Sequence, residues 1–199
     1  MSYCEEWSPW SDDAIGDEIV EKLLKIAAVK KCGKGDIIFL ERLNNNLYLL
    51  LSGTVEISLM SAEGRKRILA VHKARTFIDD ALMSDCYCTV MMKCLTKAEF
   101  AVFEQEALTK AAYSDPSIYD CILRSVVFKL QGLTQHLADQ TFFEVEDRIY
   151  NLFLNLAKKH GRKVENGVCI EKRLTHEFIA EIVGSTRVRV TQSLKSLHS

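Results

Sequence analysis

The last sixteen residues, GSTRVRVTQSLKSLHS from Gly184 to Ser199, concentrate side chains that can hydrogen-bond to DNA bases. An arginine can donate two hydrogen bonds to guanine in the major groove, and a glutamine can pair in the same way with adenine. If the segment is helical, Val190, Leu194 and Leu197 form its inner face. The polar residues on the other faces are the candidate DNA contacts, namely Thr186, Arg187, Arg189, Thr191, Gln192 and Lys195.

A second group of chemically active side chains lies in the first half of the chain. Its members are His72, Asp79, Asp80, Cys86, Cys88 and Cys94. Thiolates, imidazoles and carboxylates are metal ligands, and Cys86 and Cys88 would share one face of a strand. A C-x-C pair without a second matched pair is a weak zinc signal, and free cysteines commonly pack as small hydrophobes. We therefore expect no metal site, and a redox or metal role is the alternative.

The composition is typical of a globular protein from a reducing compartment. The chain has 199 residues, of which 48% are hydrophobic, and this length allows one large or two modest domains. The seven cysteines show no disulfide framework, and acidic residues occupy the N-terminus where a signal peptide would be basic and then apolar. No apolar run reaches the roughly 18 residues that span a bilayer. We expect a cytoplasmic protein without a membrane segment.

Charge is distributed unevenly along the chain. From Glu144 onward there are ten basic and seven acidic residues, whereas the preceding part has sixteen basic and twenty acidic residues. The C-terminal part is therefore the one that would accept a polyanion such as DNA, although a solvated basic surface has the same composition.

The first half of the chain predicts a β-domain. A short amphipathic helix is expected at about 14–28, and runs rich in Ile, Leu, Val and Tyr follow it. Turn-forming clusters at 33–35, 44–46 and 62–64 separate these runs. Several short, regularly punctuated strands predict an antiparallel sandwich or roll, which we assign to residues 1–113.

From Ser117 the apolar pattern becomes helical. Its apolar residues recur at intervals of three or four and define a narrow seam of Ile118, Ile122, Val126, Leu130, Leu133 and Leu137. Since a seam of this length usually faces another long helix, we predict that residues 114–143 form the parallel helix of a homodimer. Packing on the β-domain of the same chain is the alternative.

Residues 144–199 predict a DNA-binding domain. Glu144–Gly161 is expected to be an amphipathic helix, and the following segment KVENGVCI contains the Asn-Gly pair that favours a hairpin. Thr175 is a candidate N-cap, and Gly184 can adopt the positive φ that a helix end needs. Two short helices joined by such a turn form a helix-turn-helix, whose second helix would bring Arg187 and Gln192 to base edges.

The order of these parts resembles the Crp/Fnr family of transcription regulators, named after the cAMP receptor protein and the fumarate-nitrate regulator. The matching segments are KGDIIF (34–39), LYLLLSGTVEI (47–57), GRKRIL (64–69), DRIYNLFLNLAKKHG (147–161) and LTHEFIAEIVGSTRVRVTQSLKSL (174–197). The resemblance implies an α+β fold with an N-terminal antiparallel β-roll of the cyclic-nucleotide-binding type, a long dimerisation helix and a C-terminal helix-turn-helix. It also implies a homodimer on a near-palindromic DNA site, with RNA polymerase as a further partner.

The effector segment departs from the cyclic-nucleotide-binding members. Their phosphate cassette reads Phe-Ile-Gly-Glu-Leu and, some ten residues later, Arg-Ser or Arg-Thr, whereas this chain has FIDDALMSDCYCTV. Asp79 and Asp80 stand for the Gly and the ribose-binding Glu, and Cys88 stands for the phosphate-binding Arg. We therefore expect cAMP and cGMP not to bind, and a different small-molecule or redox effector to use a pocket that includes Phe77, Asp79, Asp80, Cys88 and Thr89.

Two further departures concern DNA. Members that read TGTGA-like half-sites carry Arg-Glu at the start of the recognition helix and a second Arg further along. This chain keeps Arg187 but has Val188 and Gln192 at the other two positions, so we expect a different half-site. Family chains also continue into a β-hairpin wing, and with the sequence ending at Ser199 we expect its phosphate contacts to be absent.

We expect a one-component, effector-responsive transcription regulator that binds specific DNA sequences and is independent of cAMP. The alternative is an effector-sensing or interaction module of the same family that does not bind DNA. An enzyme is not expected, because the sequence has no Gly-rich phosphate loop, no H-E-x-x-H motif and no convincing catalytic triad. No cofactor is expected either.

Overall fold

The structure is a computed structural model that describes residues 10–11, 14–40, 46–78, 89–171 and 174–197. The chain divides into two compact units, a β-unit over Trp10–Gln131 and a helical unit over Gly132–Ser199. The boundary falls inside the long helix that was predicted for residues 114–143. Among the described residues, no helix is long and apolar enough to cross a membrane.

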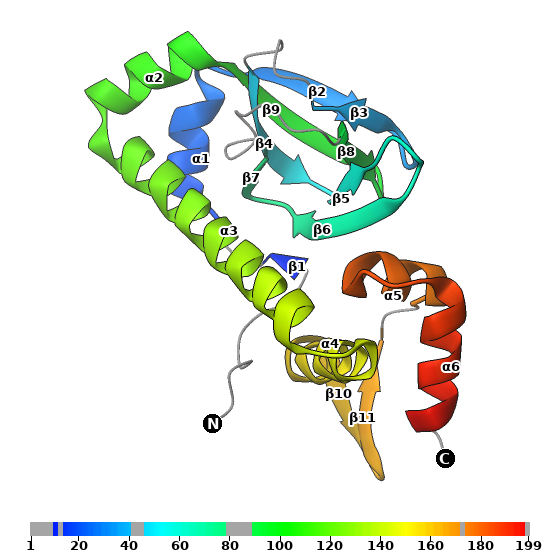
Figure 1. Cartoon of the computed structure of the whole chain (residues 1–199). Coiled ribbons are helices and arrows are strands. Elements are labelled where there is room, and N and C mark those ends of the chain that lie inside the picture. Colours follow the sequence, from blue (N-terminus) through cyan, green and yellow to red (C-terminus); the bar gives the residue numbers. More distant parts are fainter. Residues whose placement is uncertain (1–9, 12–13, 41–45, 79–88, 172–173, 198–199) are drawn as a thin grey trace. The chain divides into compact units, whose positions relative to one another are not determined.

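The β-unit is built on two sheets (Figure 1), and the predicted β-roll is confirmed. One sheet has five strands in the order β1, β6, β5, β8, β3, and the other has four in the order β2, β9, β4, β7. Neighbouring strands are antiparallel except β1 and β6. The strands are β1 (Trp10–Ser11), β2 (Ala28–Cys32), β3 (Ile37–Phe39), β4 (Asn46–Ser52), β5 (Thr54–Met60), β6 (Lys66–Lys73), β7 (Thr76–Ile78), β8 (Thr89–Cys94) and β9 (Ala98–Glu104).

Apolar side chains that alternate along the strands form a buried cluster shared by the two sheets. In β5 the side chains of Val55 and Ile57 belong to this cluster, as alternation along a strand requires. Tyr48 of β4 and Phe100 of β9 contribute a T-shaped ring pair with centroids 6.2 Å apart. This cluster holds the strands of the roll in register.

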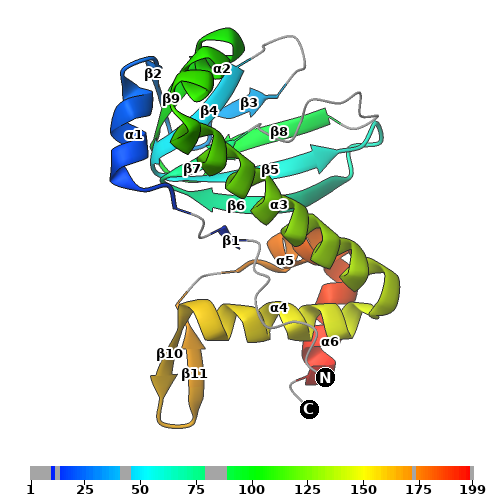
Figure 2. The ribbon, with the colours of Figure 1, turned by 90° about the vertical axis from the view of Figure 1, so that its left-hand side faces the viewer.

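A second apolar cluster joins the four-stranded sheet to three helices. These helices are α1 (Asp17–Leu24), α2 (Gln105–Ser114) and α3 (Pro116–Phe142), and Figure 2 faces the side of the β-unit on which they lie. Leu23 from α1, Leu108 from α2 and Ile118 from α3 pack there with strand residues such as Phe103. The helices therefore bury the face of the sheet that is turned away from the roll interior.

The helical unit contains the end of α3 and the elements of the predicted DNA-binding domain. They are α4 (Val145–His160), β10 (Gly161–Val164), β11 (Gly167–Ile170), α5 (His176–Val183) and α6 (Arg187–Leu197). Its most deeply buried apolar side chains come from three helices and include Ile149, Leu152, Leu156, Ile182 and Val190. The predicted hairpin is confirmed, with Val164 paired to Gly167.

Gly161 joins α4 to the hairpin at a point where no side chain fits. A Cβ atom at this position would lie 2.1 Å from the carbonyl oxygen of Ala157 and 2.2 Å from Cγ1 of Val168. The backbone of Gly161 is extended, with φ −90° and ψ 141°, so the glycine is required by close packing and not by a left-handed helix end.

We expect Gly161→Ala to lower the free energy of unfolding by about 1 to 3 kcal/mol, because the helix and the hairpin must move apart. The matched control is Gly16→Ala, where φ is −65° and a Cβ meets nothing within 4 Å. That change should stay within about 1 kcal/mol. Chemical denaturation of the two variants tests the difference, and equal stabilities would contradict the steric argument.

Candidate DNA-binding interface

The turn between α5 and α6 has the geometry predicted for a helix-turn-helix. Thr175 caps α5, since its Oγ1 accepts a hydrogen bond from the Phe178 N–H at 3.1 Å. Gly184 ends α5 in the left-handed region with φ 66° and ψ 55°. The N–H of Ser185 then donates to the carbonyl of Ala180 at 3.0 Å, which satisfies one of the carbonyls at the helix end.

Two of the predicted DNA contacts form hydrogen bonds inside the motif. Oγ1 of Thr186 accepts from the Arg189 N–H at 3.3 Å and so caps α6. The Thr191 hydroxyl donates to the Arg187 carbonyl at 2.9 Å, and Nδ1 of His176 lies 2.8 Å from Oγ1 of Thr191. Because the hydroxyl proton is used, His176 must donate through Nδ1. Sequence reasoning missed His176, whose role depends on a residue fifteen positions away.

The other four predicted residues form the exposed face of α6, consisting of Arg187, Arg189, Gln192 and Lys195. Val188 lies among them and is 67% exposed. On the inner face Val190 is fully buried, as predicted, but Leu197 is 52% exposed. The prediction that Leu197 belongs to the inner face is therefore wrong. Ser193, one turn after Val190, is the residue that is buried instead.

A third arginine, which was not predicted, adds positive charge beside this face. Arg148 belongs to α4, and burial is the main factor that lowers the pKa of its guanidinium. The charge of Arg189 lowers that pKa further, while Glu144 and Asp139 raise it. The two guanidinium groups therefore lower each other's preference for the charged form, and the positive end of the α6 dipole adds to the positive potential at this end of the helix.

The predicted effector pocket includes residues inside and outside the described ranges. Asp79, Asp80 and Cys88 lie outside the described residues, and Thr89 begins β8 with a side chain that is also outside them. Phe77 contradicts its prediction, because it is fully buried in the cluster between the four-stranded sheet and the helices. Strand alternation explains this placement, and the next residue, Ile78, packs in the roll interior instead.

Of the cysteines in the candidate redox group, Cys94 is the one that the structure describes. It is fully buried in the roll cluster, and Cys32 of the opposite sheet packs against the same cluster, a neighbour that sequence reasoning missed. Burial raises the pKa of Cys94 to about 11, so the thiol stays protonated and is a poor metal ligand. No cluster of three metal-binding side chains occurs in the described ranges.

His72 also belongs to this candidate group and is buried in β6 with 4% of its surface exposed. Burial, with a smaller contribution from the charge of Lys129, lowers the pKa of His72 to about 3. The imidazole is therefore neutral at physiological pH, and its Nδ1 has no hydrogen-bond partner among the described residues.

The exposure of side chains along α3 agrees with the predicted seam only in the second half of the helix. Ile118 is 4% exposed and packs, together with the half-buried Ile122, against the apolar cluster of the four-stranded sheet, so little of either side chain is available to a partner helix. The exposed seam on α3 is shifted by one residue in its first half and consists of Tyr119, Leu123, Val127, Leu130, Leu133 and Leu137. Val126 is half-buried. The N-terminal half of α3 carries two apolar stripes, and the sequence pattern followed the buried one.

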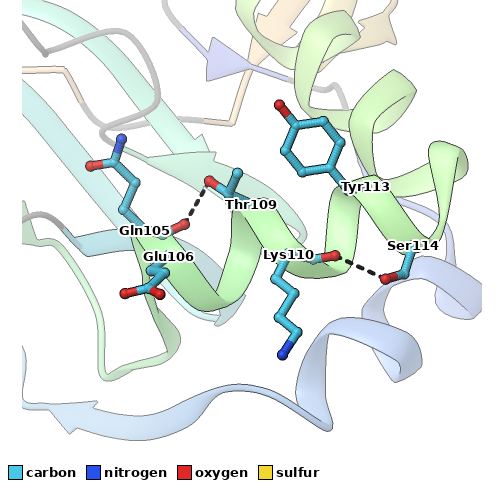
Figure 3. Close-up of a pocket in the computed structure, with 6 residues that line it drawn as sticks. All are labelled: Gln105, Glu106, Thr109, Lys110, Tyr113 and Ser114. Carbon is cyan, nitrogen blue, oxygen red and sulfur yellow. Dashed lines mark hydrogen bonds between the residues drawn. The ribbon is translucent and has the colours of Figure 1, made fainter.

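A shallow pocket on α2 offers no alternative effector site. Its lining residues, Gln105, Glu106, Thr109, Lys110, Tyr113 and Ser114, all come from this single helix (Figure 3). The hydroxyls of Thr109 and Ser114 donate to carbonyls of their own helix at 2.8 and 3.0 Å. No polar groups from different elements converge there, as a specific ligand site would require.

Comparisons with known proteins match both units. Residues 29–115 match the family described as "Cyclic nucleotide-binding domain", and residues 147–199 match "Crp-like helix-turn-helix domain". The chain is 26% identical over 163 residues to a "CRP-like cAMP-activated global transcriptional regulator" of Mycobacterium tuberculosis, covering 81% of this chain and 73% of that protein. It is 21% identical over 192 residues to the "Anaerobic regulatory protein" of Bacillus subtilis, covering 95% and 81%.

Solved structures show the same fold. The structure described as "OCPA complexed CprK" has a TM-score of 0.79 at 18% identity and covers 99% of this chain and 89% of its own. The c-di-GMP responsive global regulator CLP of Xanthomonas campestris also has a TM-score of 0.79, at 20% identity and 92% coverage of each chain. With both domain types matched in the order seen here, the chain belongs to the Crp/Fnr family of transcription regulators.

Proposed function

We propose that the protein is an effector-responsive transcription regulator that binds DNA through α6. The observation that supports this most directly is the capped helix-turn-helix, which leaves Arg187, Arg189, Gln192 and Lys195 exposed together. In this motif the N-terminal part of the second helix enters the major groove. Arg187 and Gln192 then have the reach and the donors to recognise a guanine and an adenine. Val188 cannot accept a hydrogen bond from cytosine, as a glutamate there could.

We expect Arg187→Ala to cost about 1 to 3 kcal/mol of binding free energy, lost at one guanine position of the half-site. In vitro selection gives the preferred site, and fluorescence anisotropy across a salt series gives the affinities. Arg162→Ala is the matched control, because Arg162 is an exposed arginine of the hairpin that pairs with Glu171 at 2.9 Å.

The control variant should bind with unchanged base preference. An unchanged preference for Arg187→Ala would contradict direct reading by this residue. If the unaltered protein shows no sequence preference with or without effector candidates, the alternative of a sensing or interaction module that does not bind DNA is favoured.

We also propose that the protein is a homodimer joined through the exposed seam on α3. Leu130, Leu133 and Leu137 are 61, 43 and 68% exposed, an unusual amount of apolar surface for one helix face. The spacing of three and four residues suits a parallel two-helix contact. A dimer is also what a near-palindromic DNA site requires, because two-fold protein symmetry matches two half-sites.

Leu137→Glu should weaken the dimer at least about a hundredfold, because two carboxylates would be buried in the seam without partners. Tyr150→Glu is the matched control, since Tyr150 is 53% exposed on α4 and lies off the seam. Sedimentation equilibrium measures both. Equal dissociation constants for the two variants would show that the dimer uses another surface.

We propose that the effector is not a cyclic nucleotide. The argument rests on the stretch from Asp79 to Cys88, where two carboxylates and a thiol stand at the positions of a glycine, a glutamate and a phosphate-binding arginine. A cyclic phosphate would lose a bidentate charged contact there. In isothermal titration calorimetry we expect no cAMP binding at micromolar concentrations, with an authentic cAMP-activated relative as the positive control. Micromolar binding by this protein would refute the proposal.

A further inference from the structure

One glutamine connects the end of α3 to the helix-turn-helix. Nε2 of Gln140 donates a hydrogen bond to the carbonyl oxygen of Val183 at 3.0 Å. Val183 is the last residue of α5, so its carbonyl is one of those that a helix end leaves without an intrahelical partner. Gly184, in its left-handed conformation, follows directly. Gln140 therefore holds the turn that aims α6.

The acceptor end of the same amide is bonded to a third helix. Nη1 of Arg148, on α4, donates to Oε1 of Gln140. An amide side chain has a donor end and an acceptor end, and here each end has its own partner. The orientation of the Gln140 side chain is thereby defined, and α3, α4 and α5 meet at one group.

The surroundings of Arg148 make this link sensitive to change. The Nε atom of Arg148 is buried without a hydrogen-bond partner among the described residues, so Gln140 supplies a contact that the guanidinium needs. Asp139, 7% exposed on α3, favours the charged form of the guanidinium. Residues of all three helices close around this point in a small cleft lined by His136, Asp139, Gln140, Arg148, Leu152, Ile182 and Val183.

The link lies next to the surface that the proposed dimer uses. Leu133 and Leu137 are exposed on α3 two turns and one turn before Gln140, within the same compact unit. In the dimer these leucines face the partner, and Gln140 joins their helix to α5. The distance between the two copies of α6 then depends on whether the hydrogen bonds of Gln140 to Val183 and Arg148 are formed. That distance has to match half-sites about one helical turn of DNA apart.

We propose that Gln140 and Arg148 are positioning residues that set the half-site spacing accepted by the dimer. The inference rests on the proposed function and deepens it. Neither residue needs to touch a base, because both act through the placement of α6. Replacing Gln140 or Arg148 should therefore change the preferred half-site spacing and the affinity ratio between spacings. The base preference within one half-site should stay the same.

The test compares palindromic DNA sites whose half-sites are moved one base pair closer, left in place or moved one base pair apart. The unaltered protein should prefer one spacing by at least about tenfold, and Gln140→Met should reduce this preference to about threefold or less. Gln140→Glu keeps an acceptor for Arg148 but loses the donor to Val183, so it should also reduce the preference. Thr141→Ala is the control, since the Thr141 hydroxyl donates only one turn back to Leu137 at 2.8 Å.

Each outcome decides between distinct conclusions. A full spacing preference in folded Gln140→Met, with the melting temperature and dimer constant unchanged, would overturn the inference. The inference would also be overturned if Gln140→Met lost as much affinity for a single half-site as for the palindromic sites. In that case the residue would only support the fold. If the unaltered protein itself ignores spacing, the proposed DNA-binding dimer fails, which is a different result from failure of the variants.

Discussion

The helix α3 has to satisfy two apolar surfaces at once, and this constraint shapes the rest of the molecule. Its first half buries Ile118 and Ile122 on the sheet of its own chain, while Tyr119 and Leu123, one position along, are exposed. A helix with apolar residues on adjacent faces can touch the β-unit and a second copy of itself together. Any change in the roll that moves the buried stripe must also move the exposed one, so in the proposed dimer a change at the effector site would reach the partner through this helix.

Local signals explain why much of the DNA-binding motif could be predicted from sequence. The cap at Thr175 and the left-handed Gly184 each depend on residues within one turn, and the structure confirms both. The β-roll was predictable for a similar reason, because strand alternation and turn residues are short-range patterns.

The errors and omissions concern contacts between residues distant in sequence. Phe77 was assigned to the effector pocket because of its neighbours in the chain, but the side of the sheet that it faces is decided by strand pairing. Ile118 belonged to a predicted seam with regular helical spacing. That Ile118 is buried while Tyr119 is exposed depends on which side of α3 packs on the sheet. Cys32 with Cys94, and Gln140 with Arg148, meet across different elements, and no spacing rule in one sequence reveals such pairs.

Val188 gives α6 an exposed apolar side chain, which could contact a methyl group of a base as its charged neighbours could not. It is 67% exposed and lies between two arginines in the sequence, on the same exposed part of α6 as the proposed DNA contacts. An apolar side chain in the major groove can contact the C5-methyl group of thymine. The same contact is available to 5-methylcytosine and is lost with uracil. If Val188 lies against such a base pair in the proposed complex, affinity there would respond to covalent methylation of the DNA, which leaves the hydrogen-bonding groups of the base edge unchanged.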